Sequence, residues 1–202
     1  STLEPLIALP SSPGNVVPDP GFEGGSPNAD WDEDSTNFGN VICSSDLCGM
    51  DLANTGDFYV WFGGIDSANE SGYVEQSITI PSATSASLRF YLWIESSSTN
   101  GHIRVKIDGD PLFEATEADS GDYANYTAVN LDVSSYADGS PHLLRFEGYT
   151  EAGDITNFIL DDICLQTSQA TPTPTTTPSM TPTPTPTATP TPSPTTQAVC
   201  RP

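Results

Sequence analysis

Residues 87–95 read SLRFYLWIE, and this stretch decides the fold class because apolar residues occupy every second position. Successive side chains of a β-strand point to opposite faces. One face therefore collects the large apolar side chains Leu88, Phe90, Leu92 and Ile94. The other face carries Arg89, Tyr91, Trp93 and Glu95. The alternation predicts a strand with one face in a hydrophobic core and the other towards solvent or a partner.

Shorter runs with the same period recur along residues 15–167, separated by Gly, Asn, Asp or Pro, and no stretch sustains a helical period. The sets that share one face are Val74, Gln76, Ile78 and Ile80; Ile103, Val105 and Ile107; His142, Leu144 and Phe146; and Ile159, Asp161, Ile163 and Leu165. Roughly eight to ten strands are predicted from such runs. We therefore expect an all-β protein, with residues 15–167 forming a two-sheet antiparallel jelly-roll sandwich.

A short apolar segment, residues 1–14, precedes this domain and reads STLEPLIALPSSPG. Its large side chains are Leu3, Leu6, Ile7 and Leu9. The segment is too short to fold alone, so we expect it to be buried as a strand. It either docks on its own domain or is donated to a neighbouring copy of the chain.

The C-terminal tail, residues 168–202, alternates Thr and Pro over most of its length. This composition favours an extended polyproline II conformation, because it offers nothing to bury. Such stalks are often O-glycosylated in secreted proteins. The candidate acceptors are Thr173, Thr183, Thr185 and Thr191.

The charge balance is strongly acidic, with 27 Asp and Glu against 5 Lys and Arg and a formal net charge of −22. Nucleic acid is excluded as a partner, since phosphate binding needs clustered Lys and Arg. An anionic membrane would repel the same surface, and no apolar run reaches the ~20 residues that span a bilayer. The chain begins at Ser1 without an initiator Met, which is typical of a processed, secreted product.

Four cysteines fit an extracellular or cell-surface protein with disulfides. No His lies near any of them, which disfavours a metal site. Cys43 and Cys48, in CSSDLC, are expected to pair across a loop. Cys164 would then pair with Cys200 and tie back the tail, or one of these two would bridge copies of the chain.

The opening of the domain, NVVPDPGFEGGSPNADW at residues 15–31, resembles the first strand of carbohydrate-binding-module-type jelly rolls with the galactose-binding-like fold. Asp19 stands where that pattern has Asn. The likeness continues in order through YVWFGG, YVEQSITIP, SLRFYLWIE, HIRVKIDGDPLF, PHLLRFEG and TNFILDDICL. Modules of this kind are generally non-catalytic and recur in bacterial extracellular surface proteins, so the fold alone does not define the function.

The resemblance also implies a structural Ca²⁺ ion between the opening strand and the last strand. It would place the ligands at Glu23 and Asp161, with Asp19 and a nearby backbone carbonyl completing the shell. Asp161 lies on an apolar face by its spacing, where an unpaired carboxylate would be costly. The alternative is an edge carboxylate that accepts hydrogen bonds from backbone amides. Asp162 should point the other way.

Aromatic side chains on a solvent face are the candidates for contact with a sugar, because pyranose rings stack on Trp and Tyr. Tyr91 and Trp93 fulfil this condition, and Tyr59 and Trp61 have the same parity on another strand. Arg89 is a candidate hydrogen-bond donor to the glycan. These aromatic side chains would equally suit packing beneath a loop or against a neighbouring copy.

No catalytic motif appears in the sequence, and neither His102 nor His142 has a neighbouring nucleophile motif. We therefore expect no enzyme. The first hypothesis is a structural subunit of an extracellular bacterial filament or surface assembly, whose partners are other copies of itself. The alternative is a carbohydrate-binding module joined by its Thr/Pro tail to an enzyme or a cell-wall anchor, with glycans as partners.

Overall fold

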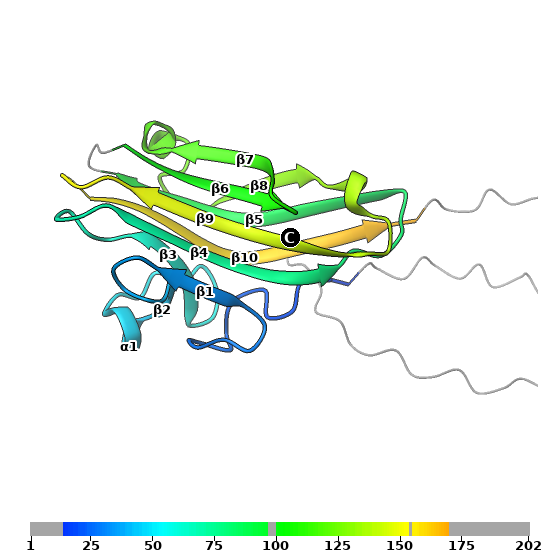
Figure 1. Cartoon of the computed structure of the whole chain (residues 1–202), viewed down its shortest axis with the longest axis horizontal. Helices are drawn as coiled ribbons and strands as arrows, with labels where there is room; N and C mark the ends of the chain where they lie inside the picture. The colour runs from blue at the N-terminus through cyan, green and yellow to red at the C-terminus, as the bar shows by residue number, and fades with distance from the viewer. Residues whose placement is uncertain (1–13, 97–99, 154, 170–202) are drawn as a thin grey trace, which may run out of the picture.

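The computed structural model describes residues 14–96, 100–153 and 155–169, which form two five-stranded sheets packed face to face (Figure 1). Sheet A contains, in spatial order, β1 (Asp32–Ser35), β4 (Glu70–Thr79), β9 (Pro141–Thr150), β6 (Gly101–Ile107) and β7 (Asp110–Thr116). Sheet B contains β2 (Ile42–Ser44), β3 (Phe58–Gly63), β10 (Thr156–Ser168), β5 (Ser85–Ser96) and β8 (Thr127–Asp132). The short helices are α1 (Ser45–Cys48), η1 (Glu117–Gly121) and η2 (Ser134–Tyr136). All strand pairs are antiparallel, so the predicted all-β sandwich is confirmed.

The hydrophobic core lies between the sheets and follows the alternation of residues 87–95. All four apolar side chains of that stretch are buried, while Arg89, Tyr91 and Trp93 are only half-buried on the outer side of β5. Phe90 of sheet B meets Phe146 of sheet A edge to face, with ring centroids 5.4 Å apart. Such aromatic pairs add to the apolar area that already drives the two sheets together.

The central strand of sheet B departs from the predicted alternation. The register of β10 against β5 shifts between Asp161 and Cys164, and Asp162 adopts a positive φ of 53°. This β-bulge adds a residue, so the faces exchange partway along the strand. Ile163 and Leu165 join the core between the sheets, whereas Ile159 packs in a separate cluster on the outer side. The prediction that Asp161 shares a face with Ile163 and Leu165 is therefore wrong.

The opening segment, residues 14–31, runs antiparallel to the C-terminal half of β10. Val16 N–H donates to the Leu165 carbonyl at 3.0 Å, and Ile163 N–H donates to the Pro20 carbonyl at 2.8 Å. The Asn15 side chain bonds the same stretch of β10, donating to the Ile163 carbonyl and accepting from Leu165 N–H. The first described residues thus complete sheet B where β3 no longer pairs with β10.

Several predictions fall on residues 1–13 and 170–202, which lie outside the described part of the chain. They are the burial of Leu3, Leu6, Ile7 and Leu9, the polyproline II tail, and the pairing of Cys200. The same holds for the glycan acceptors Thr173, Thr183, Thr185 and Thr191. These remain predictions.

His142 hydrogen-bonds two carboxylates, Asp108 in the turn between β6 and β7 and Asp138, and we call this group the histidine clamp. The nearly buried His142 ring lies between two carboxylates, with Nδ1 2.7 Å from Asp108 Oδ2 and Nε2 3.1 Å from Asp138 Oδ1. Both ring nitrogens donate only when the imidazole is protonated. The hydrogen bond to Asp108 is the main cause that raises the pKa of His142, against the opposing effect of burial.

Replacing His142 by Gln should remove a pH-dependent part of the stability. Because the folded-state pKa is raised above 6.5, this contribution is fully present below pH 6.5 and is lost as the pH rises through the folded pKa. The difference in unfolding free energy between wild type and His142→Gln should therefore shrink from pH 6 towards pH 9. Urea unfolding at several pH values measures it.

The matched control is His102→Gln, because burial and the nearby Arg104 lower the pKa of His102. The contribution of His102 to the free energy of unfolding should be present above pH 6.5 and be lost as the pH falls. A wild type to His142→Gln difference that is constant with pH would contradict a protonated clamp.

Candidate functional site

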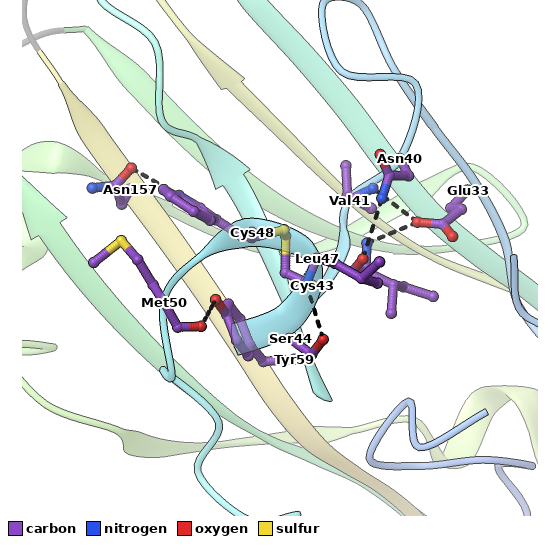
Figure 2. The surroundings of a disulfide bond; sticks show 12 residues. Glu33, Asn40, Val41, Cys43, Ser44, Leu47, Cys48, Met50, Tyr59 and Asn157 are labelled. Carbon is purple, nitrogen blue, oxygen red and sulfur yellow. Dashed lines mark hydrogen bonds between the residues drawn. A yellow bond between two sulfur atoms is a disulfide. The ribbon is translucent and has the colours of Figure 1, made fainter. Parts of the chain in front are cut away.

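The outer face of sheet B is covered by residues 43–57, which begin at a disulfide loop (Figure 2). Cys43 and Cys48 are bonded as predicted and span α1, whose first turn is capped by the Ser44 hydroxyl. Cys43, Tyr59 and Ile159 form a small buried cluster outside the main core. The partly buried side chains packed on it are Cys48, Leu52, Ala53, Trp61, Trp93 and Tyr126. Cys164 has no free thiol, and its predicted partner, Cys200, lies outside the described residues.

Two tyrosine hydroxyls fasten this covering segment to the sheet. Tyr59 Oη donates to the Met50 carbonyl at 2.8 Å (Figure 2), and Tyr126 Oη donates to the Leu52 carbonyl at 2.7 Å. Burial, and to a lesser extent the carboxylate of Asp51, raises the pKa of Tyr59 to about 12. Burial also raises the pKa of Tyr126. Both phenols therefore stay protonated and keep donating at any physiological pH.

The two carboxylates of the β10 bulge fasten the same segment. Asp161 Oδ2 accepts from the backbone N–H groups of Asn54 and Thr55, at 2.8 and 3.1 Å. Asp162 accepts from the side chains of the same two residues. The prediction that the side chain of Asp162 points the opposite way from that of Asp161 is therefore wrong. Because of the bulge, both carboxylates bond to the same two residues, Asn54 and Thr55.

The predicted sugar-binding aromatics sit on or beneath this covered face. Tyr59 is fully buried, so its ring is not accessible to a sugar, and the prediction for Tyr59 is wrong. Trp93 packs edge to face against Tyr126, with centroids 6.0 Å apart. Trp61 donates its indole N–H to Asn157 Oδ1. These contacts match the alternative of packing beneath a loop.

Tyr91 and Arg89 lie next to each other on the outer side of β5, with the guanidinium carbon 5.7 Å from the ring centroid. Both side chains are half-buried. Contact of Tyr91, Trp93, Trp61 and Arg89 with a glycan stays a prediction.

The predicted calcium ligands Glu23 and Asp161 both lie near Gly21. A Cβ built on Gly21 would lie 3.7 Å from Glu23 Oε1 and 3.9 Å from Asp161 Oδ1, and these oxygens already accept backbone N–H groups of Asp57 and Asp162, respectively. Burial, together with the neighbouring Asp162 carboxylate, raises the pKa of Asp161 to about 7. A buried anion of this kind is stabilised by a cation, and carboxylate oxygens are the ligands that Ca²⁺ prefers. The chemistry of Glu23 and Asp161 therefore fits the ion.

Other features of this region limit the proposed calcium shell. Asp19 Oδ2 accepts from Gly24 N–H and the Asn28 side chain, and so serves the loop instead of the space beside Gly21. No group of three or more His, Cys, Asp or Glu side chains suited to a metal occurs in the described ranges. Backbone oxygens would have to complete the coordination. The hydrogen bonds from Asn54 and Thr55 are those of the metal-free alternative, so calcium remains a proposal.

The outer face of sheet A carries a hollow with a volume of about 500 Å³, which we call the sheet A hollow. Three neighbouring strands, β4, β9 and β6, contribute side chains to it in register. One row across the strands is Ser71, Tyr149 and His102, and the next is Tyr73, Glu147 and Arg104. In the third row, Glu75, Arg145 and Lys106, only Arg145 lines the hollow. Asp34 of β1 extends the second row beside Tyr73.

Charged groups on this face are paired, although the chain as a whole is strongly acidic. Three of its five Lys and Arg residues, Arg104, Lys106 and Arg145, lie here. Arg145 bridges Glu75 and Glu147, at 2.6 and 3.1 Å, and Lys106 also pairs with Glu147. Burial alone would raise the pKa of Glu147, but hydrogen bonds from Lys106 and Arg145 outweigh it and lower the pKa. The face is therefore locally balanced in charge.

Aromatic rings lie among these charges. The Arg145 guanidinium stacks over the Tyr73 ring at 3.9 Å, and the His102 ring lies 5.6 Å from that of Tyr149. Burial and the carboxylates of Asp32, Glu75 and Asp34 raise the pKa of Tyr73, so its hydroxyl remains a donor. Burial, followed by Arg104, lowers the pKa of His102, which keeps the imidazole neutral at pH 7. Both groups can thus exchange hydrogen bonds with a neutral polar ligand.

The sheet A hollow was not predicted from the sequence. The parity of the runs at 74–80, 103–107 and 142–146 already implied that Tyr73, His102 and Arg145 point outward. What it lacked was the pairing register that lines these side chains up on adjacent strands. The clustering of three scarce cations in two of those runs was the available signal.

No protein-family model matches the chain, and no curated protein matches it in sequence. Solved structures do match in three dimensions. A structure of promiscuous carbohydrate-binding modules of the β-sandwich superfamily gives a TM-score of 0.50 at 13% identity, covering 77% of this chain and 61% of that one. A family 61 carbohydrate-binding module solved with β-1,4-galactotriose gives 0.44 at 17% identity, covering 76% and 99%. A cyclase from Fischerella sp. TAU gives 0.48 at 11% identity, covering 79% and 100%.

At these identities the likeness shows the fold alone. The chain has the jelly-roll β-sandwich fold found in carbohydrate-binding modules, as its opening motif and strand order predicted. The site must be argued from this chain's own residues.

Calcium should stabilise the protein if it binds between Glu23 and Asp161. An ion that binds only the folded state adds RT ln(1 + [Ca]/Kd), about 2.7 kcal/mol at a hundredfold excess over Kd. Chelation should therefore lower the melting temperature of the wild type, and calcium should restore it. Glu23→Gln and Asp161→Asn should each abolish this shift in a thermal melt.

Asp162→Asn is the matched control, because it alters the neighbouring carboxylate without removing either proposed ligand. It should keep the calcium-dependent shift. A wild-type melting curve that does not respond to chelator would show that backbone amides alone satisfy Asp161.

Proposed function

We propose that the chain is an extracellular, non-catalytic glycan-binding module whose site is the sheet A hollow. The observation that carries this proposal is the combination of Tyr73, Tyr149 and His102 with paired Arg and Glu side chains on one concave, in-register face. Sugars offer weakly polar C–H faces ringed by hydroxyl groups. Aromatic rings pack against the C–H faces, and fixed donors and acceptors hydrogen-bond to the hydroxyl groups.

The polar groups of the hollow are preorganised by their mutual ion pairs. Glu147 is held by two cations, Lys106 and Arg145, and Arg145 is held by Glu75 and Tyr73. Side chains that are already ordered lose little entropy when a ligand binds. The arrangement thus favours recognition of a hydroxyl-rich ligand without large rearrangement.

The charge pattern favours a neutral glycan over an acidic one. Each cation on this face already pairs with a carboxylate, so an anionic sugar would have to compete with Glu75, Glu114 or Glu147. The net charge of −22 adds a long-range repulsion for anions. Neutral hydroxyls instead bond to lone pairs and N–H groups that the ion pairs leave free.

The proposal of a non-catalytic role rests on the state of the titratable groups in the hollow. Two cations, Lys106 and Arg145, keep Glu147 ionised, so this carboxylate is not available as a general acid. The neutral His102 imidazole packs against Tyr149, and we assign it a hydrogen-bonding role towards the glycan.

An extracellular location fits the Cys43–Cys48 disulfide, because such bonds persist in oxidising compartments. The described residues include no helix with the length and apolar character to cross a membrane. The attachment of the module through its Thr/Pro tail to an enzyme or a cell-wall anchor stays part of the proposal, because residues 170–202 lie outside the described part.

Truncating a hollow aromatic should weaken glycan binding. Suitable probes are β-1,4-galactotriose and xylan oligosaccharides, measured by titration calorimetry. For any probe that binds the wild type, Tyr149→Ala and Tyr73→Ala should each raise the Kd about tenfold or more. Aromatic side chains often contribute most of the binding energy at such sites. Far-ultraviolet circular dichroism and a thermal melt would confirm that the variants fold.

Tyr91→Ala is the matched control, as it truncates a half-buried tyrosine on the outer face of the other sheet. It should leave the Kd unchanged. Loss of binding in Tyr91→Ala, with normal binding in Tyr149→Ala, would move the site to sheet B. Absence of binding to every neutral oligosaccharide tried would refute the proposed function.

A further inference from the structure

A second hollow, on the sheet B side of the molecule, is lined by exposed apolar groups. It has a volume of about 340 Å³ and lies beside α1 and the Cys43–Cys48 disulfide. Phe38 and Leu47 on its wall are 54% and 53% exposed, and Trp61 is half-buried there, so the three side chains form one accessible apolar patch. We call it the disulfide hollow; Figure 2 shows Leu47 and the disulfide at its side.

The disulfide hollow lies far along β10 from the N-terminal end of the described chain. The hollow also touches Gly63, which pairs with Asn157 near the start of β10. The described chain begins at Gly14, beside the stretch of β10 that follows Leu165. Asn157 and Leu165 are roughly 25 Å apart along the strand, at ~3.3 Å per residue. Gly63 on the wall of the hollow and Val16 next to the start of the described chain thus pair with opposite ends of β10.

The segment before Gly14 has the composition that such a hollow would take. Residues 2–9 read TLEPLIAL and carry a single charge, on Glu4, in a chain with 27 acidic residues. Pro5 and Pro10 limit its pairing in a sheet, so its side chains are its main means of binding. Leu3, Leu6, Ile7 and Leu9 match a pocket walled by Phe, Leu and Trp.

We propose that the disulfide hollow binds residues 2–9 of a second copy of this chain, joining copies head to tail. Val16 pairs with Leu165 of β10. From Val16 back to Gly14 the chain runs along β10 away from the hollow. To reach the far wall of its own hollow, at Gly63, it would have to reverse and cover the same ~25 Å, which uses all of residues 6–14 when fully extended. Ile7 and Leu9 would then lie short of that wall. A second copy has no such restriction.

This contact joins two different surfaces, so it repeats without closing unless the rotation happens to form a ring. The result would be an open chain of copies, which is the filament hypothesis in structural form. Because each copy carries a charge of −22, electrostatic repulsion opposes assembly. Added salt screens that repulsion, so association should strengthen between 20 mM and 500 mM NaCl.

Sedimentation velocity of the full chain over a range of concentrations and salt tests the contact. Wild type should associate into growing oligomers, and deletion of residues 1–10 should leave a folded monomer. Phe38→Asp and Leu47→Asp should raise the concentration at half-association by about tenfold or more. Leu143→Asp is the matched control, since Leu143 is 40% exposed on the other sheet, and it should associate like wild type.

A synthetic peptide of residues 1–12 adds a direct readout. It should bind the deletion variant and quench or shift tryptophan fluorescence, and Leu47→Asp should prevent this. A wild type that stays monomeric at all concentrations and salts overturns the proposal, and peptide binding to the deletion variant would then indicate docking on the same copy. Assembly of the deletion variant, or loss of assembly in Leu143→Asp, overturns it as well. The proposal is independent of glycan binding, which lies on sheet A.

Discussion

Two adjacent carboxylates in the middle of β10, those of Asp161 and Asp162, hold the segment that covers the outer face of sheet B. The β-bulge between Asp161 and Cys164 brings both carboxylates to Asn54 and Thr55, one through backbone amides and the other through side chains. Removing the Asp161 carboxylate would leave two part-buried N–H groups without this acceptor, which destabilises the covering segment. The covering segment and everything packed under it depend on this local arrangement.

The outer faces of the two sheets differ. Sheet B is covered by residues 43–57, to which Tyr59 of β3 and Tyr126, just before β8, donate hydrogen bonds. Sheet A has a concave surface on which Tyr73, Tyr149 and paired charges line a hollow. A glycan would meet prearranged polar groups on sheet A, whereas sheet B offers an apolar hollow beside its disulfide. The two proposals of binding and assembly therefore concern separate surfaces.

Simple periodicity predicted much of the fold. The alternation in residues 87–95 and 103–107 assigned the core faces of β5 and β6 correctly, because those strands are regular over these residues. It failed at Asp161, since a bulge inserts one residue without any change in composition that marks it. The Cys43–Cys48 pairing followed from close spacing, which a tight loop can bridge.

The candidate site was harder to predict for a different reason. Parity assigns a side chain to one side of a sheet but does not say what lies over it, so Tyr59 was placed on a solvent face that a loop covers. Parity also does not say which strands are neighbours. Tyr73, Glu147 and Arg104 are far apart in sequence and meet only through the register of β4, β9 and β6.

An NMR titration distinguishes a glycan site in the sheet A hollow from one on the outer face of sheet B. Backbone amide shifts of the full chain would be followed while a neutral oligosaccharide that binds is added. A glycan in the sheet A hollow should cause the largest shifts in β4, β9 and β6, around Tyr73, Tyr149 and Arg104. Largest shifts in β3 and β5, around Trp61, Tyr91 and Trp93, would contradict it.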